Sequence, residues 1–278
     1  MKRSVPAACC ATLLILLTSC GGGSSDTGTA ETPTGTTGTT GTSTGTGTGA
    51  SSSTLITLDH GGFTLQYDCS AHTAMRYEYT LDVDTGSAAR PSAFTLDPDL
   101  PAGCAQQTST SSYASVMPGW DRGHLVTSNH MDASAALIAR ANHMSNIVPQ
   151  VSTFNQGIWL DAENVAECHR DLAPVQVVGG VVYDDISNDH FVSSHGIRTP
   201  DWFWKVIVTT DTSGATRAIA WFIPNRPMLN TLDSYLVSIE ALEQQVGADR
   251  VGLGTLPLAV RQSKPASTWA LPAGCGLG

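Results

Sequence analysis

The sequence predicts an α+β fold, with a mixed or antiparallel sheet core and helices packed on it. Runs rich in β-branched and aromatic residues predict strands at 175–183, 203–210 and 217–223. Leucine and isoleucine at three- and four-residue steps predict a helix within 229–246. Because no regular crossover helices separate the early strands, this mixture favours the α+β class.

The first residues have the architecture of a signal peptide. A basic pair precedes an apolar stretch, 7–17, that is short for a membrane span. The small residues before Cys20 resemble a bacterial lipobox, which predicts a signal peptide over 1–19 and acylation of Cys20. Gly21 follows, as in lipoproteins sent to the outer membrane, so we expect an exported, lipid-anchored protein. The alternative is an ordinary secretory signal with an incidental cysteine.

The segment 20–53 is almost entirely glycine, serine and threonine after Cys20. Such a composition cannot bury enough apolar surface to offset the entropy of ordering, so it predicts a flexible linker. The remainder, 54–278, is long enough for one sizeable core and is expected to form a single domain.

The centre of the chain carries the residue types that phosphodiester cleavage requires. Asp121-Arg122-Gly123-His124 is followed by Asn155-Gln156-Gly157-Ile158-Trp159 and then by Glu163. Such a reaction needs a base, a metal ion and cations. His124 suits the base, and Asn155 offers the hard, neutral oxygen that Mg²⁺ accepts.

The spacing of apolar residues from Ile158 onward predicts a helix. An unbroken helix would separate Asn155 from Glu163 by roughly 12 Å along its axis. We therefore expect Glu163 to act through a metal-bound water. The alternative is a helix-capping Asn155 and a solvated Glu163.

These runs, together with Ser145-Asn146-Ile147-Val148-Pro149-Gln150, resemble the DNA/RNA non-specific endonuclease family, the ββα-metal nucleases. Weaker similarities extend over most of 55–258. The resemblance implies a ββα-metal motif, DNA and RNA as substrates, and Mg²⁺ as cofactor, with Mn²⁺ as an alternative. It also implies that His124 is the general base, that Asn155 is the direct metal ligand, and that Glu163 holds metal waters.

The same resemblance assigns cationic residues. Arg76 resembles the family's early arginine, which contacts the scissile phosphate. Arg122 would brace the site or contact phosphate, and Asp121 is near enough in sequence to orient His124. Where the family usually has an arginine after the glutamate, this chain has Glu167, which would repel phosphate. The expected substrate-binding residues are Arg122, Arg140, Arg170, which could partly substitute for the missing arginine, and Lys205.

Four cysteines remain after removal of the signal peptide and lipidation of Cys20. In an oxidising compartment they predict two disulfides, with three connectivities, of which we prefer Cys69 with Cys104 and Cys168 with Cys275. Zinc ligation is the rival interpretation, but no pair has the close spacing usual for structural zinc.

The net charge is 14 − 24 = −10. Cationic contacts drive much of the affinity for nucleic acids, so long-range attraction should be weak, although local arginines and a divalent ion can hold one phosphate. Besides an endonuclease, the sequence leaves open a phosphodiesterase for small diesters and an inactive envelope binding lipoprotein. No feature indicates an oligomeric state.

Overall fold

A computed structural model of the protein describes residues 55–227 and 229–276. The expected signal peptide, the acylated Cys20 and the linker lie outside these residues. Within the described part, no helix combines the length and apolar character needed to cross a membrane.

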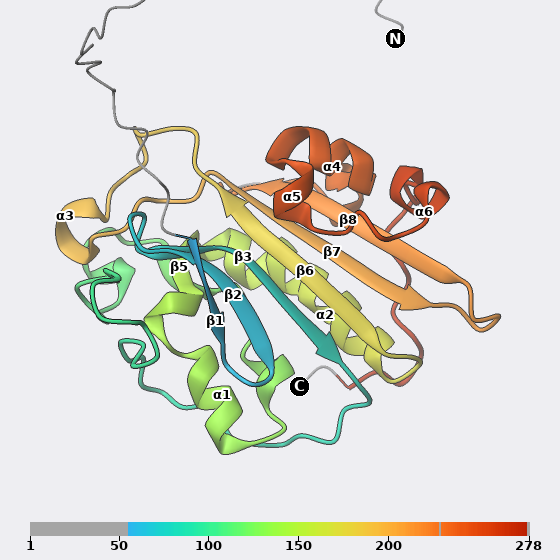
Figure 1. The fold of residues 1–278 in the computed structure, drawn as a ribbon, viewed down its shortest axis with the longest axis horizontal. Coiled ribbons are helices and arrows are strands. Elements are labelled where there is room, and N and C mark those ends of the chain that lie inside the picture. Colours follow the sequence, from blue (N-terminus) through green and yellow to red (C-terminus); the bar gives the residue numbers. More distant parts are fainter. Residues whose placement is uncertain (1–54, 228, 277–278) are drawn as a thin grey trace, which may run out of the picture. The chain divides into compact units, whose positions relative to one another are not determined.

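A seven-stranded sheet forms the centre of the fold (Figure 1). Every ladder in it is antiparallel, in the order β1-β2-β3-β6-β7-β8-β9. The strands are β1 (Leu55–Asp59), β2 (Phe63–Asp68), β3 (Thr73–Leu81), β6 (Val175–Val182), β7 (Trp202–Thr210), β8 (Thr216–Pro224) and β9 (Leu236–Val237). The three strands expected at 175–183, 203–210 and 217–223 correspond to β6, β7 and β8. The α+β fold is therefore confirmed.

Both faces of the sheet are covered. Along β7, Phe203 and Ile207 belong to one buried apolar cluster, whereas Trp204 and Val206 belong to another. Since successive side chains of a strand point to opposite faces, this alternation requires a layer on each side. In Figure 1, α2 (Leu160–Arg170) covers one face and α4 (Ile239–Val246), α5 (Ala248–Val251) and α6 (Leu258–Gln262) cover the other.

The predicted helix within 229–246 forms only in its second half. Leu232–Tyr235 is a 3₁₀ turn, and Leu236 and Val237 pair as β9 with the edge of β8. The α-helix begins after Ser238, whose Oγ accepts a hydrogen bond from Ala241 N at 3.1 Å. A serine cap of this kind fixes where a helix starts.

A second, two-stranded sheet pairs β4 (Trp120–His124) with β5 (Ile147–Val151), antiparallel. Between them lie α1 (Ala135–Ala141) and 3₁₀ turns at Asn129–Met131 and Met144–Asn146. The short elements Tyr113–Ser115 and α3 (Val192–His195) complete the described fold. After β5 the chain enters a π-helical turn, Phe154–Trp159, and then α2, so β4, β5 and α2 form a ββα unit.

Two disulfides tie distant segments together. The structure joins Cys69 to Cys104 and Cys168 to Cys275, the pairing preferred from the sequence. The second bond attaches the C-terminal segment to α2. That segment also packs Trp269 against His169 of the same helix, with ring centroids 5.3 Å apart.

Candidate active site

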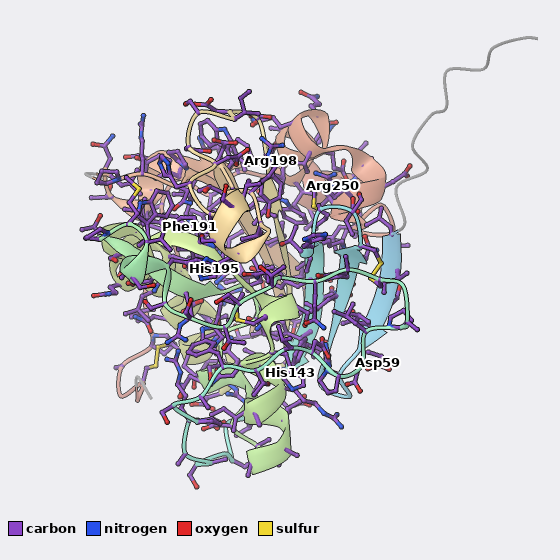
Figure 2. All side chains as sticks on the ribbon, turned by 90° about the vertical axis from the view of Figure 1, so that its left-hand side faces the viewer. Asp59, His143, Phe191, His195, Arg198 and Arg250 are labelled. Carbon is purple, nitrogen blue, oxygen red and sulfur yellow. A yellow bond between two sulfur atoms is a disulfide. The ribbon has the colours of Figure 1, made fainter. Side chains whose placement is uncertain are left out.

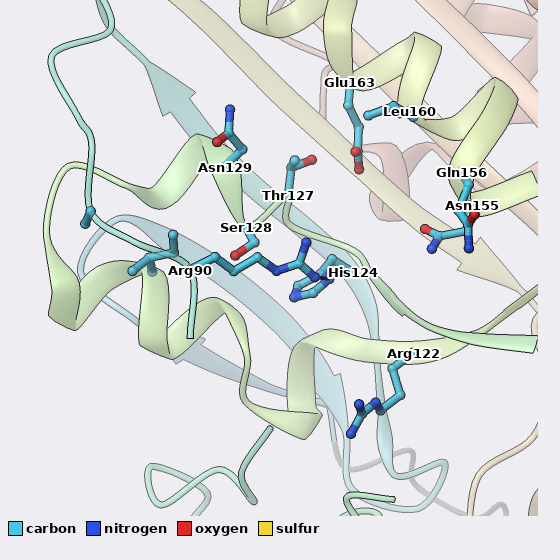
Figure 3. A pocket seen from close by; sticks show the side chains of 12 residues that line it. Arg90, Arg122, His124, Thr127, Ser128, Asn129, Asn155, Gln156, Leu160 and Glu163 are labelled. Atoms are coloured by element: carbon cyan, nitrogen blue, oxygen red, sulfur yellow. Dashed lines mark hydrogen bonds between the residues drawn. The ribbon is translucent and has the colours of Figure 1, made fainter. Parts of the chain in front are cut away.

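The ββα unit brings the central sequence motifs to one pocket of about 410 Å³. Figure 3 shows side chains from β4, from the loop after it and from the start of α2 facing this space. The pocket is lined by Ala88, Arg90, Arg122, His124, Thr127, Ser128, Asn129, Ile138, Asn155, Gln156, Leu160 and Glu163.

His124 stands at the end of β4, opposite Ile147 of β5. A Cβ at its neighbour Gly123 would lie 2.1 Å from the Gln150 side chain. Glycine is therefore favoured at position 123 because the Gln150 side chain of the neighbouring strand approaches it closely. Only a residue without a side chain lets Gln150 pack beside the histidine strand.

The hydrogen bonds of Asn142 determine the tautomer of His124. Asn142 Nδ2 donates to Pro91 O at 2.8 Å and to Ala93 O at 3.1 Å, so its Oδ1 is the acceptor that faces His124. His124 Nε2 lies 2.9 Å from that oxygen. Nε2 therefore carries the proton, and Nδ1 keeps the lone pair that a general base needs.

His124 is held in its neutral form. Burial, then the charge of Arg90, lowers its pKa to about 4, although the hydrogen bond to Asn142 opposes this shift. The Arg90 Nη2 atom lies 3.4 Å from His124 Nδ1. The imidazole is thus an unprotonated base next to a guanidinium that can meet a phosphate.

This pKa predicts the acidic side of the pH–rate profile. If His124 is the general base that the sequence predicts, activity requires its neutral form, and a lowered pKa keeps the ring neutral to lower pH, so kcat/KM should hold well below pH 6.5. A profile of kcat/KM from pH 4 to 8 at saturating Mg²⁺ checks this. An acidic midpoint at or above 6.5 would contradict the burial and the Arg90 contact described here.

Asp121 acts on Asn155, and no hydrogen bond joins it to His124. Asp121 accepts hydrogen bonds from Asn155 Nδ2 at 2.9 Å, from Gln156 Nε2 at 2.7 Å and from Ser152 Oγ at 2.7 Å. Burial opposes its ionisation, but these three donors outweigh burial and lower the pKa of Asp121. The carboxylate fixes the Asn155 amide with Nδ2 toward Asp121, which leaves Oδ1 available to another partner.

The predicted unbroken helix from Asn155 to Glu163 does not form. Gly157 has φ −117° and ψ −109°, outside the helical region, and the regular helix begins at Leu160. The axial separation inferred from the sequence therefore does not apply. Both Asn155 and Glu163 line the pocket, and Asn155 is held by Asp121 and does not cap a helix.

Glu163 lies against a buried cation. Lys205 Nζ lies 3.7 Å from Glu163 Oε1 and 4.0 Å from the centre of the Trp159 ring. Burial raises the pKa of Glu163, and Lys205 opposes the rise, while burial lowers the pKa of Lys205 to about 8. Lys205 is fully buried, so it balances Glu163 and has no access to substrate.

The residues present fit a hydrated Mg²⁺. One amide oxygen and one carboxylate in a pocket open to water match a cation that binds proteins through few oxygen ligands. The fixed orientation of Asn155 supports this fit, because its free oxygen is the atom type that Mg²⁺ takes.

Several expected phosphate contacts lie elsewhere. Arg76, on β3, binds Glu78 at 2.7 Å and the carbonyl of Val251, away from the pocket. Arg140 donates to His60 O at 2.7 Å and does not line the pocket. Among the expected cations, the structure brings only Arg122 to the pocket, where its guanidinium lies 4.0 Å from the centre of the Phe94 ring.

Glu167 does not face the pocket either. Its carboxylate lies 3.4 Å from His130 Nε2 and 3.4 Å from Arg170 Nη1. Arg170 also donates to Asp82 O at 2.7 Å. The expected repulsion of phosphate by Glu167, and its compensation by Arg170, are therefore not supported by the positions of these side chains.

Sequence reasoning missed Arg90 and Asn142, which contact the two nitrogens of His124. Neither stands in a recognisable motif. Arg90 comes from the segment before Pro91, whose carbonyl is itself a partner of Asn142. The role of Asn142 could not be predicted, because the residue meets His124 only in the folded chain.

Comparison with known proteins gives consistent results. The family described as DNA/RNA non-specific endonuclease matches residues 39–251. A nuclease from Nostoc sp. is 29% identical over 67% of this chain and 70% of its own length, and one from Serratia marcescens is 24% identical over 70% and 74%. The solved EndoG/EndoGI complex superposes with a TM-score of 0.57 at 20% identity, over 69% of this chain and 83% of the solved one, which supports the fold.

Proposed function

Because the chain belongs to the DNA/RNA non-specific endonuclease family, we propose that it is a metal-dependent endonuclease that hydrolyses phosphodiester bonds of both DNA and RNA at the pocket beside His124. The observation that carries the proposal is the pair of fixed orientations in one pocket. Asn142 leaves Nδ1 of His124 unprotonated, where it accepts a long hydrogen bond of 3.4 Å from Arg90 Nη2, and Asp121 leaves the oxygen of Asn155 free.

In this mechanism His124 Nδ1 takes a proton from a water molecule. The resulting oxygen nucleophile attacks phosphorus as the bond to the leaving oxygen breaks. Arg90, at the edge of the imidazole, and Arg122, on the same strand as His124 and held by Thr110 O at 2.7 Å, meet the negative charge of the phosphoryl oxygens. Contacts with phosphate do not distinguish one base from another. We therefore expect cleavage with little sequence preference.

Asn155 would hold Mg²⁺ directly and Glu163 would hold its water ligands. When bound, the ion supplies charge stabilisation for the phosphate and the leaving oxygen. The buried Lys205 favours the ionised form of Glu163, because its charge opposes the rise that burial causes in the pKa of that carboxyl. Mn²⁺ is the alternative cation, since carboxylate, amide and water ligands suit it as well.

We also propose export and anchoring to the outer membrane through acylated Cys20, with 20–53 as a tether for the enzyme. The support is the sequence pattern at 1–21 and the two disulfides of the folded part, which suit an oxidising compartment. Labelling with a radioactive fatty acid tests this, with Cys20→Ala as the control that should remain unlabelled.

The competing function is hydrolysis of small diesters. The acidic net charge of −10 favours it, because a polynucleotide would be weakly attracted. Turnover of plasmid DNA and total RNA, measured beside a small aryl diester under the same conditions, separates the two. Efficient cleavage of the polymers supports the endonuclease, and cleavage of the small diester alone supports the alternative.

Arg90→Gln is expected to lower kcat/KM on DNA by about 100-fold, because one charge that meets the reacting phosphate is lost from the pocket. The matched variant is Arg76→Gln, which removes an arginine that binds Glu78 outside the pocket. Its activity per folded molecule should stay within about threefold of the wild type. A larger loss of kcat/KM in Arg76→Gln than in Arg90→Gln would mean that Arg76 contacts the phosphate, as predicted from the sequence.

A further inference from the structure

A second group of metal-ligating side chains lies outside the nuclease pocket. His60, Asp97 and His143 offer one ligand atom each, and these atoms lie within 4.8 Å of one another. They come from the turn after β1, from the segment before Cys104, and from the residue that follows the C-cap of α1. None of the three lines the pocket beside His124.

The two histidines lie within ion-pair distance of the carboxylate, and both lower the pKa of Asp97. His60 Nε2 lies 3.3 Å from Asp97 Oδ2, and His143 Nδ1 lies 3.3 Å from Asp97 Oδ1. Yet both ring nitrogens of His60 and Nδ1 of His143 are buried without a hydrogen-bond partner. Because an unpaired buried nitrogen is costly, a cation shared by these groups would stabilise them.

We propose that His60, Asp97 and His143 bind a divalent transition-metal ion of the Zn²⁺ class. Two imidazoles and a carboxylate are ligands that Zn²⁺ takes, with a fourth position for water. Donor atoms about 2.0 to 2.2 Å from a tetrahedral ion lie about 3.4 Å apart, close to the two measured distances. The ligand atoms now lie within 4.8 Å of one another, so His143, whose side chain is the most exposed of the three, would have to turn toward the ion.

The surroundings of the cluster resemble the outer shell of a metal site. His60 Nδ1 lies 3.5 Å from Asp99 Oδ2, so Asp99 can accept its N–H when Nε2 faces the ion. Ser145 Oγ donates to Asp97 Oδ2, and Asp99 N donates to Asp97 Oδ1 at 2.9 Å. Two carboxylates also balance the charge of a divalent cation, while Arg140 binds the carbonyl of His60 and not its ring.

The ion would hold together the segments that support the catalytic base. His143 follows Asn142, the partner of His124. Thr95, two residues before Asp97, accepts from Met144 N at 2.8 Å and donates to Asn142 O at 3.3 Å. Figure 2 labels His143, which follows α1, and Asp59, the last residue of β1, which precedes His60. The ion would therefore join three segments that also meet through these contacts, through Arg140 with His60 O and through Ser145 with Asp97.

The test uses the full chain, with its disulfides formed and freed of metal by EDTA, in buffer with excess Mg²⁺. Zn²⁺ bound after gel filtration is measured by mass spectrometry, and Co²⁺ is added separately to record the absorption of a four-coordinate site. We expect one Zn²⁺ per chain and a higher melting temperature when it is bound. His60→Gln and His143→Gln should weaken binding by at least about 100-fold, and Asp99→Asn by about tenfold.

Two controls should bind as the wild type does: His190→Gln, which removes an exposed histidine, and Asn155→Ala, which alters the nuclease pocket. Loss of Zn²⁺ in Asn155→Ala, or full binding by His143→Gln, would overturn the proposal. So would a wild-type chain without stoichiometric Zn²⁺. If His60→Gln fails to fold, His143→Gln and the Co²⁺ spectrum of the wild type decide.

Discussion

Replacing His124 by alanine is expected to lower kcat on supercoiled plasmid by about 10²- to 10⁴-fold, the range contributed by a positioned general base. The reason is specific to the ring. Its Nδ1 is unprotonated, and the ring lines the pocket, so Nδ1 is the atom that we propose takes the proton from water. Initial rates of plasmid nicking and of RNA hydrolysis at saturating Mg²⁺ measure the loss on both substrates.

The control for this variant is His190→Ala, since His190 is exposed and lies outside the pocket. It should cut both polymers at the wild-type rate. Far-ultraviolet circular dichroism and the melting temperature establish that His124→Ala is folded. A folded His124→Ala that keeps more than about a tenth of the wild-type kcat would remove His124 from the mechanism.

Replacing Asn155 by alanine is expected to lower activity at 1 mM Mg²⁺ by at least about 100-fold, because the proposed direct ligand of the ion is lost. Part of the rate should return at high Mg²⁺, since Glu163 and the pocket remain. The dependence of initial rate on Mg²⁺ concentration, fitted for wild type and variant, measures the shift in half-saturation.

Gln156→Ala is the matched control for that variant. Gln156 is the next residue in the chain, and its Nε2 also donates to Asp121, at 2.7 Å. It lines the same pocket but has no assigned role as a ligand. Its half-saturation should change by less than about tenfold. Equal shifts in both variants would mean that Asn155 supports Asp121 and does not bind the ion.

The sequence predicted the parts of the fold that local pattern determines. The strands at 175–183, 203–210 and 217–223 carry β-branched and aromatic residues because both of their faces are buried, and this composition is visible without a structure. The segment 229–246 was predicted less well. The same apolar spacing serves a 3₁₀ turn, the edge strand β9 and the helix α4 in succession, and periodicity alone does not separate them.

The candidate site divides in the same way. His124, Asn155 and Glu163 stand in motifs whose order and spacing are informative, and the structure brings all three to one pocket. Arg90 could not be found, because its contact with His124 depends on how the loop before Pro91 folds over the ββα unit. Arg76 was assigned by its early position in the chain, and position does not determine which way a strand residue points.

The most direct test of the central claim is digestion of supercoiled plasmid and total RNA by the full chain, with Mg²⁺ and with EDTA. The account predicts cleavage of both polymers with Mg²⁺ and none with EDTA, and restoration when Mg²⁺ is returned in excess. Cleavage that continues unchanged in EDTA, or a folded and disulfide-bonded chain that cuts neither polymer with Mg²⁺, would contradict it.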